Sequence, residues 1–173
     1  AAYSTTTGTG NVAIGGDALY TNTTGGSNVG IGHYALRQTT TGSSNVALGR
    51  EALRYNTTAS NNTAVGFEAL KDNTTGAQNT AIGMYSLANN TTASDNFAGG
   101  YNALGTNTTG ASNVGIGHRA LQANTTASNN TAVGYQAGYS NTSAGNKTAV
   151  GYKAGYAGTG ADSNSVYIGH EAG

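Results

Sequence analysis

Three histidines are the first candidates for chemistry in this chain of 173 residues. His33, His118 and His170 share one place in a sequence repeat, and the first two are five repeats apart. If each repeat forms one layer of a parallel stack, layers are about 4.8 Å apart and this separation is about 24 Å. A metal site or an acid–base pair needs its side chains much closer together. We therefore expect no metal, no cofactor and no catalytic site.

Tyrosines are the second candidates, because five of those in the C-terminal half recur at two places of the repeat. Exposed tyrosines on a rigid scaffold could stack on sugar rings while Asn and Thr bind sugar hydroxyls. Tyrosines stacked layer on layer would instead cover and stiffen the structure. Both interpretations stay open, and the candidate ligand surface consists of Tyr101, Tyr135, Tyr139, Tyr152 and Tyr156.

Charged residues offset one another. Seven basic residues balance seven acidic ones, so a nucleic-acid partner is not expected. Arg37, Arg54 and Lys71 share one place of the repeat, and Glu51 and Glu68 share another three residues before it. We expect these two columns to form a compensated, solvated face rather than an anion-binding patch.

The composition excludes several further classes. The chain has 28 glycines, no proline and no cysteine, and 8% of its residues are charged. Without cysteine there is no disulfide framework and no thiolate metal site. No apolar run approaches the roughly 20 residues of a membrane span, so we expect no membrane insertion within this segment.

One pattern organises the whole chain. The sequence of Asn11–Gly15 returns in Asn28–Gly32 and Asn45–Gly49, and each glycine follows the last by 17 positions. Only the final step is 18, and we assign the extra residue to the Gly158–Asn164 loop. We number the places of the repeat from Asn11 as place one. The interpretation is a single domain over 1–173, with a partial repeat at 1–10, nine full repeats at 11–164 and a partial repeat at 165–173, forming a fragment of a longer fibre.

A repeat of 17 residues is too short for the helix pairs of about 33 to 47 residues that build most α-repeats. Its β-branched residues, glycines and Asn-Thr-Thr stretch favour strands and turns. Such a unit cannot bury an apolar face alone, so units must stack. The sequence predicts an all-β, parallel β-solenoid (a β-roll) with one coil per repeat.

Places two and four are expected to point into the coil, because alternate residues of a strand share a face. The repeat with Phe97 at place two has Gly99 at place four, so the large ring could fill the volume that the glycine leaves. The predicted structural core is Ile14, Ile31, Leu48, Val65, Ile82, Phe97, Ile116, Val133, Val150 and Ile168.

Place nine carries a column of seven leucines, which either completes the core of each coil or faces other chains. The interior of a short coil is narrow, so we favour an inter-chain contact. The possible inter-chain stripe is Leu19, Leu36, Leu53, Leu70, Leu87, Leu104 and Leu121.

The Asn-Thr-Thr column allows two interpretations. Asparagines stacked in register form internal amide ladders. Rows of threonine also resemble insect ice-binding solenoids, although those present two outward threonines per coil and here place twelve is mostly Asn. We favour the ladder and keep ice binding as an alternative.

The Asn-Val-Ala-Ile-Gly-x-x-Ala pattern, clearest at Asn11–Gly15, Asn45–Gly49 and Asn113–Gly117, resembles the head repeats of trimeric autotransporter adhesins. The fuller repeat resembles units of bacterial and phage tail-fibre proteins. This resemblance implies a left-handed β-roll, a homotrimer and an extracellular location at a cell surface or virion. The function it implies is a non-catalytic structural or adhesive shaft or head segment, with a host-surface glycan or protein as a possible partner. A glycan-binding module is the alternative.

Overall fold

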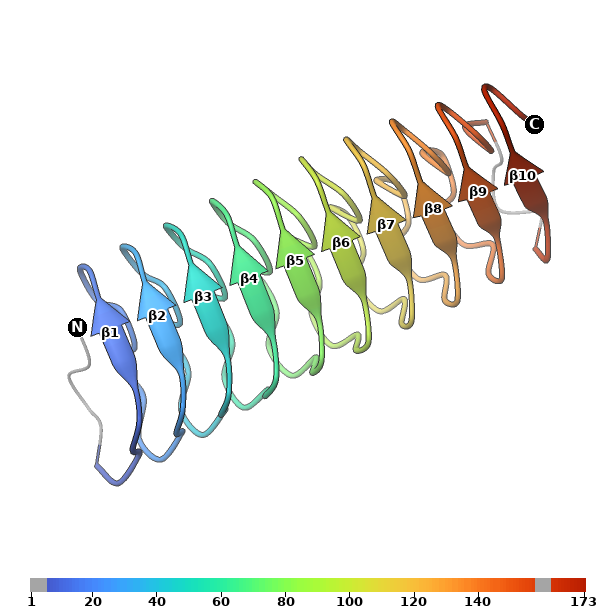
Figure 1. Cartoon of the computed structure of the whole chain (residues 1–173). Helices are drawn as coiled ribbons and strands as arrows, with labels where there is room; N and C mark the ends of the chain where they lie inside the picture. Colours follow the sequence, from blue (N-terminus) through green and yellow to red (C-terminus); the bar gives the residue numbers. More distant parts are fainter. Residues whose placement is uncertain (1–5, 158–162) are drawn as a thin grey trace.

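The computed structural model describes residues 6–157 and 163–173 and shows a rod of stacked coils (Figure 1). One sheet of ten parallel strands follows the sequence order, with one strand per repeat. No described residue is helical. The predicted all-β parallel solenoid is confirmed. Its strands are β1 (Val12–Ile14), β2 (Val29–Ile31), β3 (Val46–Leu48), β4 (Thr63–Val65), β5 (Thr80–Ile82), β6 (Phe97–Gly99), β7 (Val114–Ile116), β8 (Thr131–Val133), β9 (Thr148–Val150) and β10 (Val166–Ile168).

The pairing of the strands follows the sequence repeat. Val12 pairs with Val29, and every later pair keeps equivalent places together. The last pair joins Thr148 to Val166 and absorbs the longer final step. Residues 158–162 of the loop to which we assigned the extra residue lie outside the described residues.

Glycine at place five is required by conformation and by contact. The glycines of this column have φ between 120° and 141°, a region that residues with a side chain rarely adopt. A Cβ on Gly15 would lie 2.7 Å from the carbonyl carbon of Gly32. Glycine therefore lets the backbones of neighbouring coils meet where each strand ends.

The interior is filled by leucine against small residues. A Cβ placed on Gly30 would lie 3.5 Å from Cγ of Leu19, so the leucine of one coil packs against place three of the next strand. The alanines at places three and eight are buried with it. Our assignment of the leucines to an inter-chain stripe is wrong, because all seven are 0–1% exposed: Leu19, Leu36, Leu53, Leu70, Leu87, Leu104 and Leu121.

The predicted core residues lie on the outside of the coil. Ile14, Leu48 and Ile82 are exposed, and their neighbours in the column are exposed or half-buried. Because leucine already fills the interior, place three has room only for a small residue, and the branched side chains at places two and four point outward. This correction applies to Ile14, Ile31, Leu48, Val65, Ile82, Phe97, Ile116, Val133, Val150 and Ile168.

Two columns of buried asparagine join the coils. At place twelve, Nδ2 of Asn73 donates to Oδ1 of Asn56 at 3.0 Å, and the same bond recurs along the column as far as Asn141. This confirms the predicted amide ladder. At place one, Oδ1 of Asn28 accepts the backbone N–H of Asn45 at 2.9 Å. We did not predict this second column.

Candidate functional site

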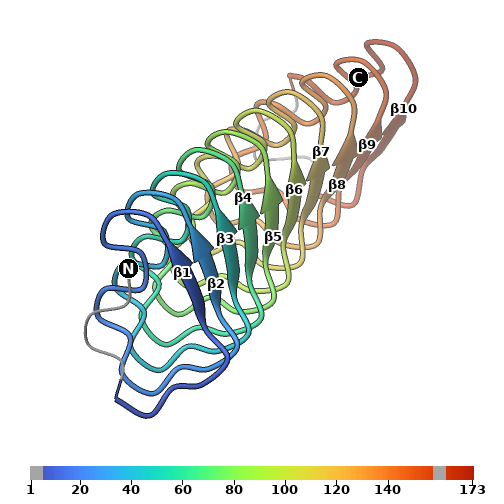
Figure 2. The same cartoon turned by 60° about the vertical axis from the view of Figure 1, so that its left-hand side comes forward.

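The outer surface of the ten-stranded sheet is apolar and, among the described residues, no segment covers it. The strands lie side by side along one side of the rod (Figure 2). Ile82 and Ile116, near the middle of the rod, are 46% and 40% exposed. We call this surface the outer sheet face. It consists of Val12, Ile14, Val29, Ile31, Val46, Leu48, Thr63, Val65, Thr80, Ile82, Phe97, Gly99, Val114, Ile116, Thr131, Val133, Thr148, Val150, Val166 and Ile168.

The outer sheet face is as large as the largest apolar patch of an ordinary monomeric protein. Ten strands at 4.8 Å spacing and three residues per strand give about 48 Å by about 10 Å, or roughly 500 Å². The largest apolar patch on a monomeric protein covers about 300–600 Å² and is often functional. None of the residues of the outer sheet face is charged.

One strand interrupts the aliphatic pattern of this face. In β6, a Cβ placed on Gly99 would lie 3.6 Å from Cε1 of Phe97. The ring of Phe97 therefore lies beside the space that an aliphatic side chain fills in other strands. The two residues are close to each other as expected, but on the outer sheet face and not in the core.

The five candidate tyrosines belong to two aromatic ladders. In the longer ladder, neighbouring ring centroids are 5.0–5.3 Å apart and the ring planes differ by 10–20°. Its members in order are Tyr101, His118, Tyr135, Tyr152 and His170. Tyr139 and Tyr156 form a second stack at 5.1 Å.

The geometry of these ladders favours a structural role for the tyrosines. Stacked rings cover the faces of their neighbours and leave mainly their edges to solvent, whereas a sugar ring stacks on an open aromatic face. The ladders also hold His118 and His170 apart, while His33 packs against Tyr34. Within the described residues, no three potential metal ligands come together.

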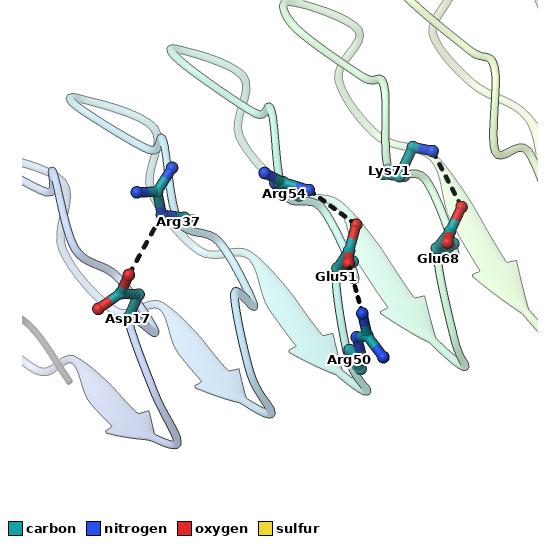
Figure 3. Close-up of polar contacts among 7 residues, drawn as sticks. All are labelled: Asp17, Arg37, Arg50, Glu51, Arg54, Glu68 and Lys71. Atoms are coloured by element: carbon teal, nitrogen blue, oxygen red, sulfur yellow. Dashed lines mark hydrogen bonds and ion pairs between the residues drawn. The ribbon is translucent and has the colours of Figure 1, made fainter.

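Ion pairs occupy the N-terminal part of another surface (Figure 3). Arg54 pairs with Glu51 and Lys71 pairs with Glu68, each at 2.9 Å. In the repeat of Arg37, place seven holds Tyr34 and not a glutamate. Arg37 therefore pairs with Asp17 of the preceding coil, at 3.5 Å. The expected compensation is confirmed, since each of the three cations has a carboxylate partner, but the face is less solvated than expected because the Glu51 and Glu68 side chains are 10% and 19% exposed.

Glu51 has the most enclosed carboxylate of this surface. Its side chain is 10% exposed, and burial alone would raise its pKa. The hydrogen bond from Arg54 and the positive charges of Arg54 and Arg50 outweigh burial and hold the pKa of Glu51 below its ordinary value. The charged side chains therefore pair with one another within this surface rather than with a ligand.

The threonine column offers one outward side chain per coil. Thr57 at place thirteen donates its hydroxyl proton to the carbonyl oxygen of Thr74 at 3.1 Å, and this bond recurs in neighbouring coils. The next threonine, such as Thr58 or Thr75, is exposed. This arrangement lacks the pair of outward threonines per coil on which the ice-binding alternative depends.

The outer sheet face is the candidate interaction surface that we did not predict from the sequence. The signal was present in the alternation of branched and small residues, but we assigned the branched residues to the interior.

No described helix has the length and apolar character needed to cross a membrane. Comparisons of the chain with protein-family models, with curated proteins and with solved structures find no match.

Proposed function

We propose that this chain is a non-catalytic structural segment of an extracellular fibre at a cell surface or virion. Three copies pack side by side through their outer sheet faces and form an adhesive shaft or head. The observation that carries this proposal is the exposed, uncharged outer sheet face along the whole sheet.

A copy of the same chain fits this face better than an unrelated partner. The partner must present uncharged apolar groups every 4.8 Å or so along a rod of parallel strands. A second copy of the chain has the same spacing between its strands because it forms the same coils. The absence of charge on the face makes nucleic acid and anionic surfaces poor partners.

The area of the contact agrees with an assembly. Three outer sheet faces packed around a common axis bury about 1,500 Å² in all, or about 500 Å² for each pair of chains, so the three contacts must form together to reach the size of a specific protein interface. Packing around a common axis lets each face contact two neighbours, and closed symmetry leaves no face open. Because the aromatic ladders and ion pairs use places outside the sheet, they stay available to solvent in this arrangement.

The sequence resemblance supports the number of chains and the location. The Asn-Val-Ala-Ile-Gly pattern resembles the Ser-Val-Ala-Ile-Gly core of the head repeats of trimeric autotransporter adhesins, and this resemblance implies three left-handed coils at a cell surface or virion. The exposed threonine column suits a fibre that is wetted by neutral groups.

Sedimentation equilibrium at micromolar concentration tests this proposal. We expect a mass three times 17.1 kDa. Ile82→Lys/Ile116→Lys places two charges on the outer sheet face and is expected to give the mass of one chain. The matched control, Thr92→Lys/Thr126→Lys, adds the same charge at exposed threonines of the same coils and should stay trimeric.

The circular dichroism spectrum of each variant shows whether the coil itself is kept. A wild-type mass of one chain would refute the assembly, and a mass of two chains would refute the threefold arrangement. Equal behaviour of the two lysine variants would show that the outer sheet face is not the interface.

A further inference from the structure

The outer sheet face repeats so regularly that it does not by itself define how copies align along the rod. A shift of one coil, about 4.8 Å, places most aliphatic residues of place four on other aliphatic residues and most residues of place two, which are Val or Thr, on residues of similar size. Only the contact at the ends is lost. A feature that occurs once along the face is needed to distinguish matched from shifted alignments.

β6 is the strand that carries such a feature. Among the ten strands, it alone has an aromatic residue on the outer sheet face, Phe97, and it alone has glycine at place four, Gly99. Phe97 is 38% exposed in the single chain, so its ring is available to another copy. Neighbouring strands present Ile82 and Ile116 at the place of Gly99.

We infer that Phe97 and Gly99 set the axial register of the copies, an inference that rests on the proposed function. In the matched register, the Phe97 rings of all copies meet at one level, with Gly99 leaving room beside each ring. Aromatic contacts there add to the apolar contact of the other coils.

A shifted register loses these contacts and adds crowding. A shift of one coil places Phe97 against strand β5 or β7 of its neighbour. These strands carry isoleucine where β6 has glycine. The same ring that fits in the matched alignment then meets a filled surface.

A composition-matched variant isolates this effect. Phe97→Val/Gly99→Ile/Val114→Phe/Ile116→Gly exchanges the outer residues of β6 and β7 and moves the aromatic level by one coil without changing composition. Wild-type chains and exchanged chains, one of them carrying a mass tag, are unfolded together, refolded together and analysed by native mass spectrometry. The control exchanges Val114 and Thr131 between β7 and β8 and leaves β6 unchanged.

We expect wild-type and exchanged chains to sort into separate trimers. A mixed trimer must either separate its rings or shift one chain by a coil and lose the contact of an end coil, so the pure trimers should be enriched over the mixed ones by about tenfold or more relative to a binomial distribution. The control chain should mix with wild type binomially. Binomial mixing of the exchanged chain, with trimers still formed, would overturn the register inference alone. Single-chain masses throughout would overturn the inference together with the proposed assembly.

Discussion

The ring of Tyr167 lies against Gly155 inside the last coil, where the earlier coils place a leucine. A Cβ on Gly155 would lie 2.9 Å from Cδ2 of Tyr167. In the seven coils from Leu19 to Leu121 the large residue is the leucine at place nine, and the small one is alanine or glycine at place three. In the next coil both residues are small, Gly138 and Ala149. At Gly155 and Tyr167 the two sizes are exchanged between places that touch, so the ring occupies the interior two coils beyond the last leucine.

This exchange can be tested by reversing it. Tyr167→Ala is expected to lower the free energy of unfolding by about 2–4 kcal/mol, because it removes a half-buried ring from the interior. Adding Gly155→Leu should recover part of the loss, since leucine then fills the space and this place already has the backbone conformation of the leucines. Urea unfolding of the four chains of this double-mutant cycle measures the coupling. Purely additive effects would show that the two residues do not share one space.

Two leucines of one repeat test which face is the interior. Leu53→Ala is expected to cost about 2–5 kcal/mol because Leu53 is fully buried. Leu48→Ala removes the same atoms from a side chain that is 43% exposed, and should cost about 1 kcal/mol or less. The unfolding free energies are compared at concentrations where the midpoint does not depend on concentration. A larger cost at Leu48 would restore the core assignment that we made from the sequence.

The period of the sequence was sufficient to predict the coil and its register. It was not sufficient to predict which side of the strand faces inward, because both sides of the pattern are apolar. The deciding feature is the leucine at place nine, which has φ between 48° and 52° in all seven coils that carry it. Bulky residues rarely adopt this left-handed conformation, so nothing in the sequence suggested that the chain turns there and brings leucine beneath the next strand.

The amide ladder at place twelve has one interruption that can be repaired. Thr39 stands where other coils have asparagine, and both its Oγ1 and Oδ1 of Asn22 are buried without a hydrogen-bond partner. Thr39→Asn is expected to bond to Asn22 and Asn56 and to raise the unfolding free energy by about 1–2 kcal/mol. Thr41→Asn on the exposed threonine column is the control and should change it by less than about 0.5 kcal/mol. A variant no more stable than wild type would show that the gap is already well accommodated.

The lowered pKa of Glu51 gives a pH dependence with a definite sign. A carboxylate whose folded pKa is depressed stabilises the protein above its unfolded pKa, here near 4.5, and this contribution is lost as the pH falls through the folded pKa. Glu51→Gln should therefore be less stable than wild type at pH 7, by about 1 kcal/mol or less. The difference should shrink as the pH falls below 4.5.

Thermal unfolding across this pH range measures the difference. Asp95→Asn removes a charge from an exposed side chain and serves as the control. A difference between Glu51→Gln and wild type that does not change with pH would contradict the ion-pair explanation.

The aromatic and charged columns were predictable as columns, because equivalent places of a stacked repeat must lie above one another. The contacts that the side chains of these columns make were not predictable to the same extent. The sequence places Tyr135 and Tyr152 in neighbouring coils, but only the ring planes, 10° apart, show that their faces cover each other. The partner of Arg37 was also open, because the acidic residue it pairs with, Asp17, lies in the preceding coil.

Thiol labelling of three single-cysteine chains tests the central claim most directly, since the chain has no cysteine of its own. Ile82→Cys reports on the outer sheet face, Leu87→Cys on the interior and Thr75→Cys on the exposed threonine column. We expect Thr75→Cys to label at every protein concentration and Leu87→Cys to stay protected in the folded chain. Ile82→Cys should label when dilute and become protected as copies assemble at micromolar concentration. Labelling of Ile82→Cys that stays equally fast at all concentrations would contradict the account.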